Sequence, residues 1–181
     1  MLGLSVETML TLKPVVHRIL EDYALPWHGT HGVGHWARVL ENGLRLSEST
    51  GANIEVVQLF AVFHDARRVN EGVDDGHGQR GAALAARLRD EWLTMSDEEF
   101  DLLYAACAGH TEGRTAADIT IQTCWDADRL DLGRVRICPD LERLCTDAAK
   151  RPEFLKWADR RACSNVIPEL IVRGWEIQDR Q

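Results

Sequence analysis

Two adjacent residues, His64 and Asp65, carry the side chains best suited to chemistry in this sequence. They end a mostly apolar stretch that runs from Val56 to Phe63. An imidazole and a carboxylate are costly to bury in such surroundings unless both groups have a partner. A metal ion bound by both groups would be such a partner. The pair therefore indicates a metal site, whose other ligands would come from elsewhere in the chain.

Other residues of metal-binding types fall on the apolar faces of predicted helices. His35 shares a face with Val39 and Leu46, because residues three or four positions apart lie on the same side of a helix. A single histidine on such a face is more often a hydrogen-bonded core residue than a ligand. Several unpaired ones would each cost about 1 to 3 kcal/mol, which favours a shared metal site. The candidate ligands besides the adjacent pair are His35, His110 and Asp128 on such faces, and His77 in the loop between two predicted helices.

Helical periodicity covers most of the chain, so we expect an all-α fold. Asn53 is expected to cap the helix that leads to His64, and Ser96 with Glu99 forms a capping-box pattern before the helix that leads to His110. No strand-like alternation extends beyond a few positions. We expect a single domain over residues 1–181, a bundle of about seven to nine helices. The expected helices cover about residues 6–23, 35–51, 53–65, 79–92, 96–110 and 121–132, with two or three more in 139–181 and a polar loop at 67–78.

The composition argues against several classes of partner. The chain has 181 residues, of which 45% are hydrophobic, and this is enough for one sizeable core. Its net charge of -8 disfavours nucleic acid as the main partner, because a phosphate backbone is bound by clustered Lys and Arg. No leader pattern and no apolar stretch of roughly 20 residues occurs, so we expect a cytoplasmic protein without membrane contact. The five cysteines contain no Cys-x-x-Cys pair and are expected to be reduced.

The ordered set His35, His64-Asp65 and Asp128 resembles the signature of the HD-domain superfamily of metal-dependent phosphohydrolases. The resemblance covers about residues 31–133, and it implies an all-α bundle in which these four residues hold a first metal ion. Asp126 is an alternative to Asp128, which we favour because it matches the family pattern Ala-Asp-x-Leu. The helices in 139–181 would cap the bundle or form an interface, and a homo-oligomer is one expectation.

Two further histidines, His77 and His110, resemble the extra ligands of family members that hold two metal ions. The resemblance implies that Asp65 bridges to a second ion, held by these two histidines. A mixed set of nitrogen and oxygen ligands suits Mn²⁺, Fe²⁺, Co²⁺, Ni²⁺ or Zn²⁺, and the spacing does not choose among them.

The resemblance also implies a reaction, the hydrolysis of a small phosphorylated metabolite such as a nucleotide phosphomonoester. The attacking group would be a metal-bound hydroxide, and the ligand Asp65 would take a direct part. Positive side chains would neutralise the phosphoryl oxygens, and Arg67 and Arg68 follow the His-Asp pair directly. Arg38 and Arg80, each near a ligand histidine, are expected to bind substrate.

Two other functions stay open for the same set of ligands. Some relatives are di-iron oxygenases, which cleave an organic substrate with O₂ instead of hydrolysing a phosphate ester. A regulatory helical domain without turnover is the third interpretation. The turn before His35 also contains His28 and His31, which we expect to be exposed residues rather than ligands.

Overall fold

The computed structural model describes residues 6–177 and shows an all-helical bundle, which confirms the predicted fold class. For residues 6–11 and Leu170 it describes the backbone alone, and the two ends of the predicted 1–181 domain, residues 1–5 and 178–181, lie outside the described part. No strand occurs within residues 6–177. The α-helices of this part are α1 (Val6–Glu21), α2 (Val33–Thr50), α3 (Ile54–Phe63), α4 (His77–Trp92), α5 (Asp97–Gly109), α6 (Ile119–Arg129), α7 (Pro152–Cys163) and α8 (Glu169–Gly174), and a 3-10 helix, η1 (Leu132–Val135), follows α6.

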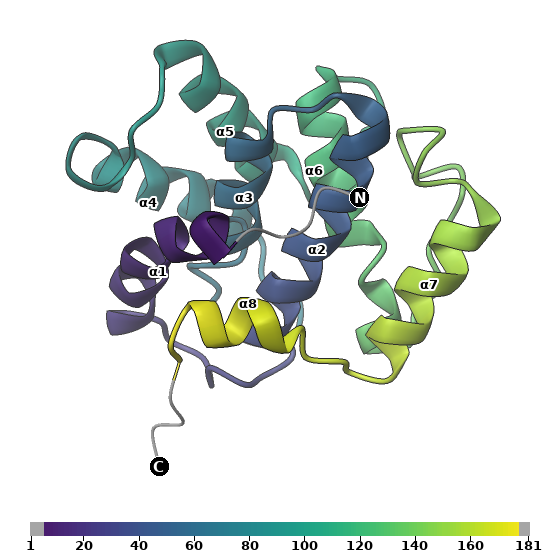
Figure 1. Cartoon of the computed structure of the whole chain (residues 1–181), viewed down its shortest axis with the longest axis horizontal. Coiled ribbons are helices and arrows are strands. Elements are labelled where there is room, and N and C mark those ends of the chain that lie inside the picture. The colour runs from purple at the N-terminus through teal and green to yellow at the C-terminus, as the bar shows by residue number, and fades with distance from the viewer. Residues whose placement is uncertain (1–5, 178–181) are drawn as a thin grey trace.

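Helix α3 lies at the centre of the bundle, in contact with α1, α2, α4, α5 and α6 (Figure 1). All of its residues from Val56 to Phe63 are buried. A helix that is apolar on every face is stable only when other elements enclose it. Its start is set by Asn53, as predicted, because the side chain accepts hydrogen bonds from the backbone N–H groups of Glu55 and Val56 at 3.0 and 3.1 Å. The end of α3, where His64 follows, is therefore inside the core.

Helix α4 begins at His77, two residues before the predicted start, and packs closely against α5 and the end of α3. Glycines permit this approach. A Cβ atom on Gly78 would lie 2.5 Å from the carbonyl oxygen of Cys107, and one on Gly81 would lie 2.3 Å from that of Phe63. Any larger residue at these two positions would push α4 away from its neighbours.

The C-terminal part of the chain covers one flank of the bundle, where α7 packs against η1 and α2, and α8 packs against α1 and α2 (Figure 1). Helix α6 ends at Arg129 instead of the predicted Leu132, because the chain turns there and places Asp131 against His35 and Arg38. Pro152 is the first residue of α7, and Pro168 directly precedes α8. Among the described residues, no helix combines the length and apolar character that crossing a membrane requires.

Candidate metal centre

The residues predicted to bind metal lie together, at the ends of the five helices from α2 to α6. His35 is in the first turn of α2 and His77 is the first residue of α4. His64 and His110 directly follow the last residues of α3 and α5, and Asp128 is in the last turn of α6. The ligand atoms form two groups, and within each group they lie within 4.8 Å of one another. The first group is His35, His64 and Asp128, and the second is Asp65, His77 and His110.

The Asp65 carboxylate connects the two groups. Its Oδ2 lies 3.5 Å from Nε2 of His35 and 3.7 Å from Nε2 of His64. Its Oδ1 lies 3.1 Å from Nε2 of His77 and 3.8 Å from Nε2 of His110. One carboxylate oxygen thus faces each group, which is the placement that a bridging ligand needs.

Each of the four histidines is oriented by an oxygen atom that faces its Nδ1. A carbonyl oxygen can only accept a hydrogen bond, so an imidazole bonded to one carries a proton on Nδ1. When that imidazole is neutral, its Nε2 has a lone pair, which faces the cluster. The acceptors are Asp131 Oδ2 for His35 at 2.7 Å, Phe60 O for His64 at 3.1 Å, Asp74 O for His77 at 2.6 Å and Cys107 O for His110 at 2.7 Å.

Lone pairs therefore face one another at the centre of the cluster. The Nε2 atoms of His35 and His64 are 3.0 Å apart, and so are those of His77 and His110. The buried Oδ1 of Asp65 accepts no hydrogen bond within the described part of the chain. Such unsatisfied acceptors are costly to bury, and a cation between them would satisfy all of them at once. These buried groups could hold metal ions, and imidazole with carboxylate suits a divalent transition metal.

The protonation states agree with this role. Burial lowers the pKa of His64 to about 3, against the attraction of the Asp65 and Asp128 charges, and burial likewise lowers the pKa of His110. Burial would raise the pKa of Asp128, but the nearby histidines, His64 first, lower it to about 2. His77 differs, since burial lowers its pKa but the neighbouring Asp65 carboxylate raises it by more. Neutral imidazoles beside ionised carboxylates are the forms that bind metal.

The alternative ligand Asp126 points away from the cluster. Its carboxylate accepts hydrogen bonds from the backbone N–H groups of Cys145 and Thr146 at 2.7 and 2.8 Å, and from the Thr146 hydroxyl at 2.8 Å. Asp126 therefore fastens the segment after η1 to α6, and Asp128 is the aspartate that the structure brings to the histidines.

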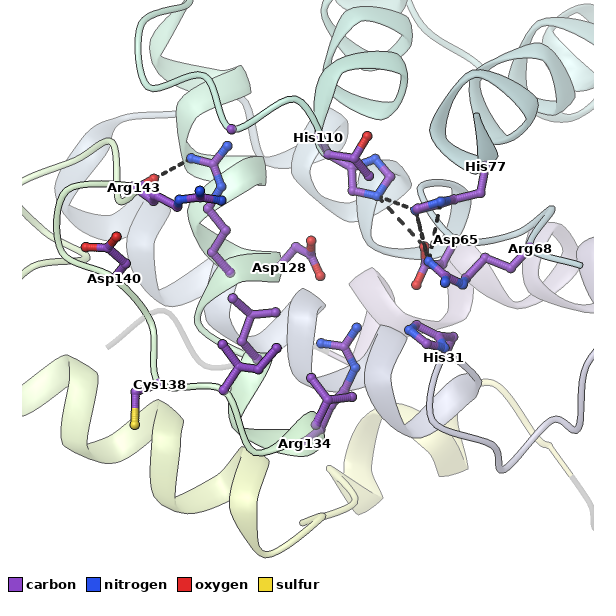
Figure 2. Close-up of a pocket in the computed structure, with 16 residues that line it drawn as sticks. His31, Asp65, Arg68, His77, His110, Asp128, Arg134, Cys138, Asp140 and Arg143 are labelled. Carbon is purple, nitrogen blue, oxygen red and sulfur yellow. Dashed lines mark hydrogen bonds and ion pairs between the residues drawn. The ribbon is translucent and has the colours of Figure 1, made fainter. Parts of the chain in front are cut away.

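A cavity of about 560 Å³ opens onto the cluster and is lined by Asp65, His77, His110 and Asp128 (Figure 2). Its far wall comes from the segment between η1 and α7, which contained no recognised motif and lies beyond the predicted core of residues 31–133. The residues that this segment and η1 contribute are Leu132, Arg134, Val135, Ile137, Cys138, Asp140 and Arg143.

Of the four arginines predicted to act on substrate, Arg68 lines this cavity and the other three do not. Its Nη1 lies 3.6 Å from Oδ1 of Asp65. The remaining three are directed elsewhere by carboxylates. Arg38 pairs with Asp131, Arg67 with Asp22 and Arg80 with Asp74.

His31, predicted to be an exposed turn residue, is instead buried and lines the cavity. Its Nδ1 lies 2.5 Å from Oε2 of Glu71, which belongs to the polar loop before α4. Nothing local in the sequence connects these two residues, since forty positions separate them. Asp131 was also missed, although it lies three residues after Asp128, so that the two would share a face of the predicted helix.

Comparison with family profiles, with curated protein sequences and with solved structures finds no match for this chain.

Proposed function

We propose that the protein is a metal-dependent phosphohydrolase of the HD-domain type, which releases phosphate from a small phosphomonoester such as a nucleotide. The observation that carries this proposal is the position of Asp65, whose two oxygens face two separate groups of ligands. Two divalent ions held side by side lower the pKa of a water molecule and neutralise the phosphoryl oxygens, which is the chemistry that phosphate ester hydrolysis requires.

The resemblance implies two metal ions, and the two groups of candidate ligands support that division. His35, His64 and Asp128 would hold one ion together with Oδ2 of Asp65, and His77 and His110 would hold the other together with Oδ1. Mn²⁺, Fe²⁺, Co²⁺, Ni²⁺ and Zn²⁺ all accept such a set of nitrogen and oxygen ligands.

His31, which lines the cavity, would move the proton. Burial lowers its pKa, so Nε2 is unprotonated near neutral pH while Nδ1 donates its hydrogen bond to Glu71. Nε2 would accept the proton that the attacking water loses and return it to the oxygen of the leaving alcohol. The products are then the alcohol and phosphate, and the enzyme is unchanged. Glu71 is a positioning residue, because it fixes the ring through Nδ1.

The test combines metal analysis with an assay of phosphate release. Protein purified without chelator is analysed for bound metal and then incubated with a panel of phosphomonoesters in Mn²⁺, Co²⁺ or Ni²⁺. The variant Asp65→Asn removes the bridging charge with little change of shape. Asp75→Asn is the matched control, because Asp75 is exposed and does not line the cavity.

We expect the wild type and Asp75→Asn to contain about two ions per chain and to release phosphate, and Asp65→Asn to lose both properties. Absence of phosphate release with every ester and every metal would overturn the proposal. Two bound irons and consumption of O₂ would then assign the same ligands to a di-iron oxygenase.

A further inference from the structure

Arg134 was not among the predicted site residues but lies in the wall of the cavity, as do Arg129 and Arg143. Arg134 belongs to η1, and its side chain is only 6% exposed. Its Nε donates a hydrogen bond to the carbonyl oxygen of Thr30 at 3.2 Å, and its Nη1 donates one to that of Asp131 at 3.1 Å. These two bonds hold the guanidinium group in the cavity wall, on the side of Asp128 and His31 (Figure 2).

Arg68 and Arg134 both line the cavity but differ in the N–H groups that they leave available. Arg68 donates from Nε to the carbonyl of Asn70 and from Nη2 to that of Gly72, while its Nη1 faces Asp65 and His77. For Nη2 of Arg134, no hydrogen-bond partner is found within residues 6–177. Arg134 therefore has a fixed and uncommitted donor at the cavity, whereas Arg68 is occupied in holding the loop and the ligands.

Electrostatics indicates what this donor binds. The carboxylates of Asp65, Asp128 and Asp131 face this site, and Asp131 pairs with Arg38 and lies 3.8 Å from Nη1 of Arg134. With two divalent ions bound, these three carboxylates could not balance both ions and the guanidinium groups of Arg38, Arg68 and Arg134. A ligand with oxygen acceptors and a double negative charge would reduce this excess of positive charge, and guanidinium N–H groups match the geometry of phosphate oxygens. We propose that Arg134 binds the phosphoryl group of the substrate through Nη2, an inference that rests on the proposed function.

The wall beyond Arg134 indicates the class of leaving group. Leu132, Val135 and Ile137 line the same cavity, and Ile137 is 53% exposed. An isoleucine this exposed contributes little to the core, and a cavity wall of this kind binds apolar surface on a ligand. With its phosphoryl group at Arg134, the substrate extends along this wall, so it is a phosphomonoester whose leaving group presents an apolar face, as the base of a nucleotide does.

The first experiment measures binding of inorganic phosphate, the product, to Mn²⁺-loaded protein by isothermal titration calorimetry. The variants are Arg134→Gln, Arg134→Lys and Arg136→Gln. Arg136 is the matched control, because it carries the same charge two residues away but is exposed and does not line the cavity. The lysine variant keeps the positive charge in the cavity wall, so it is less disruptive to the fold than the glutamine variant. The thermal unfolding midpoint and the content of bound Mn²⁺ show whether each variant is folded.

We expect Arg134→Gln to bind phosphate on the order of 10- to 100-fold more weakly, Arg134→Lys to be intermediate, and Arg136→Gln to equal the wild type. If the wild type and both Arg134 variants bind inorganic phosphate equally, Arg134 does not have the proposed role. The proposed function would still hold in that case if the wild type releases phosphate from an ester. A wild type that neither binds nor releases phosphate would overturn both.

A second measurement uses the variant Ile137→Ser to test whether the apolar wall of Leu132, Val135 and Ile137 contacts the leaving group. Because Ile137 is 53% exposed, we expect this substitution to cause only a small folding defect. The readout is the ratio of kcat/KM for phenyl phosphate to kcat/KM for glycerol 3-phosphate. Loss of apolar contact should lower this ratio by about tenfold. An unchanged ratio would overturn the assignment of the wall, whatever the result for Arg134.

Discussion

Replacing Asp131 with asparagine tests whether the orientation of His35 depends on a residue outside the cluster. Asp131 is 1% exposed, and its Oδ2 accepts the hydrogen bond of His35 Nδ1 at 2.7 Å. It also accepts two hydrogen bonds from Arg38, at 2.7 and 3.1 Å. Asparagine has nearly the same shape but only one acceptor oxygen, so its amide N–H₂ must face a donor of either His35 or Arg38. Two donors then face each other in a buried place.

The expected magnitude follows from the role of such partners. Loss of a hydrogen-bond partner behind a metal-binding histidine lowers metal affinity by about 10- to 100-fold. This corresponds to about 1.4 to 2.8 kcal/mol. The metal-free protein should also be less stable, because Arg38 is 5% exposed and loses a charged partner. Removing one partner of a buried ion pair costs about 3 to 5 kcal/mol, and the asparagine oxygen should recover part of that.

The assay is a competition titration of Mn²⁺ or Zn²⁺ against a chelating dye, with urea unfolding of the metal-free protein measured in parallel. Asp75→Asn, an exposed substitution with the same change in charge, is the control. If Asp131→Asn binds metal as tightly as the wild type, the acceptor behind His35 does not set the metal affinity and the reasoning fails. A loss of stability without a loss of affinity would lead to the same conclusion.

Three shorter predictions concern packing, proton transfer and pH. Gly78→Ala would bring a Cβ to 2.5 Å from the Cys107 carbonyl oxygen and 2.9 Å from Nδ1 of His110. We therefore expect urea unfolding to show a decrease of about 1 to 3 kcal/mol in the free energy of unfolding, together with weaker metal binding. No change in either quantity would contradict the packing argument. His31→Gln should lower kcat on the order of 100-fold with metal content unchanged, and a wild-type kcat would exclude His31 from proton transfer. Burial lowers the pKa of His64 to about 3, whereas the unfolded chain should titrate near 6.5, so the unfolded state binds the proton more readily. The urea midpoint of the metal-free protein should therefore fall as the pH drops below about 6.5, and a midpoint that stays constant down to about pH 4 would contradict this.

The parts of the fold that could be predicted are those set by contacts within one helical turn. The Asn53 cap and the capping box of Ser96 with Glu99 occur as predicted, and α2 ends at Gly51, which has a left-handed backbone conformation. Each depends on residues two to four positions apart. The missed boundaries depend on distant contacts. Helix α4 starts early where Gly78 meets Cys107, and α6 ends early where Asp131 turns toward α2.

The same distinction explains why the clustering of the candidate ligands could be predicted. His64, His77 and His110 are each oriented by a carbonyl oxygen three or four residues earlier in the chain. Their orientation is therefore local. The faces of predicted helices mark His64 and His110, whereas His77 was expected in the polar loop at 67–78 and is instead the first residue of α4. His35 is the exception, because its acceptor Asp131 lies 96 positions away.

Long side chains with distant partners could not be placed in this way. Arg38, Arg67 and Arg80 all lie near ligands in the sequence, yet carboxylates that no local pattern marks turn them from the cavity. Arg134 shows the reverse, since carbonyl oxygens of Thr30 and Asp131 hold it in the cavity. The spacing of residues in the sequence thus predicts the candidate metal ligands, which would determine the reaction class. The residues that would select the substrate lie in η1 and the segment after it, and only tertiary contacts define the position of that segment. A chain with the same ligands and a different segment between η1 and α7 should keep the chemistry and change the ester that it hydrolyses.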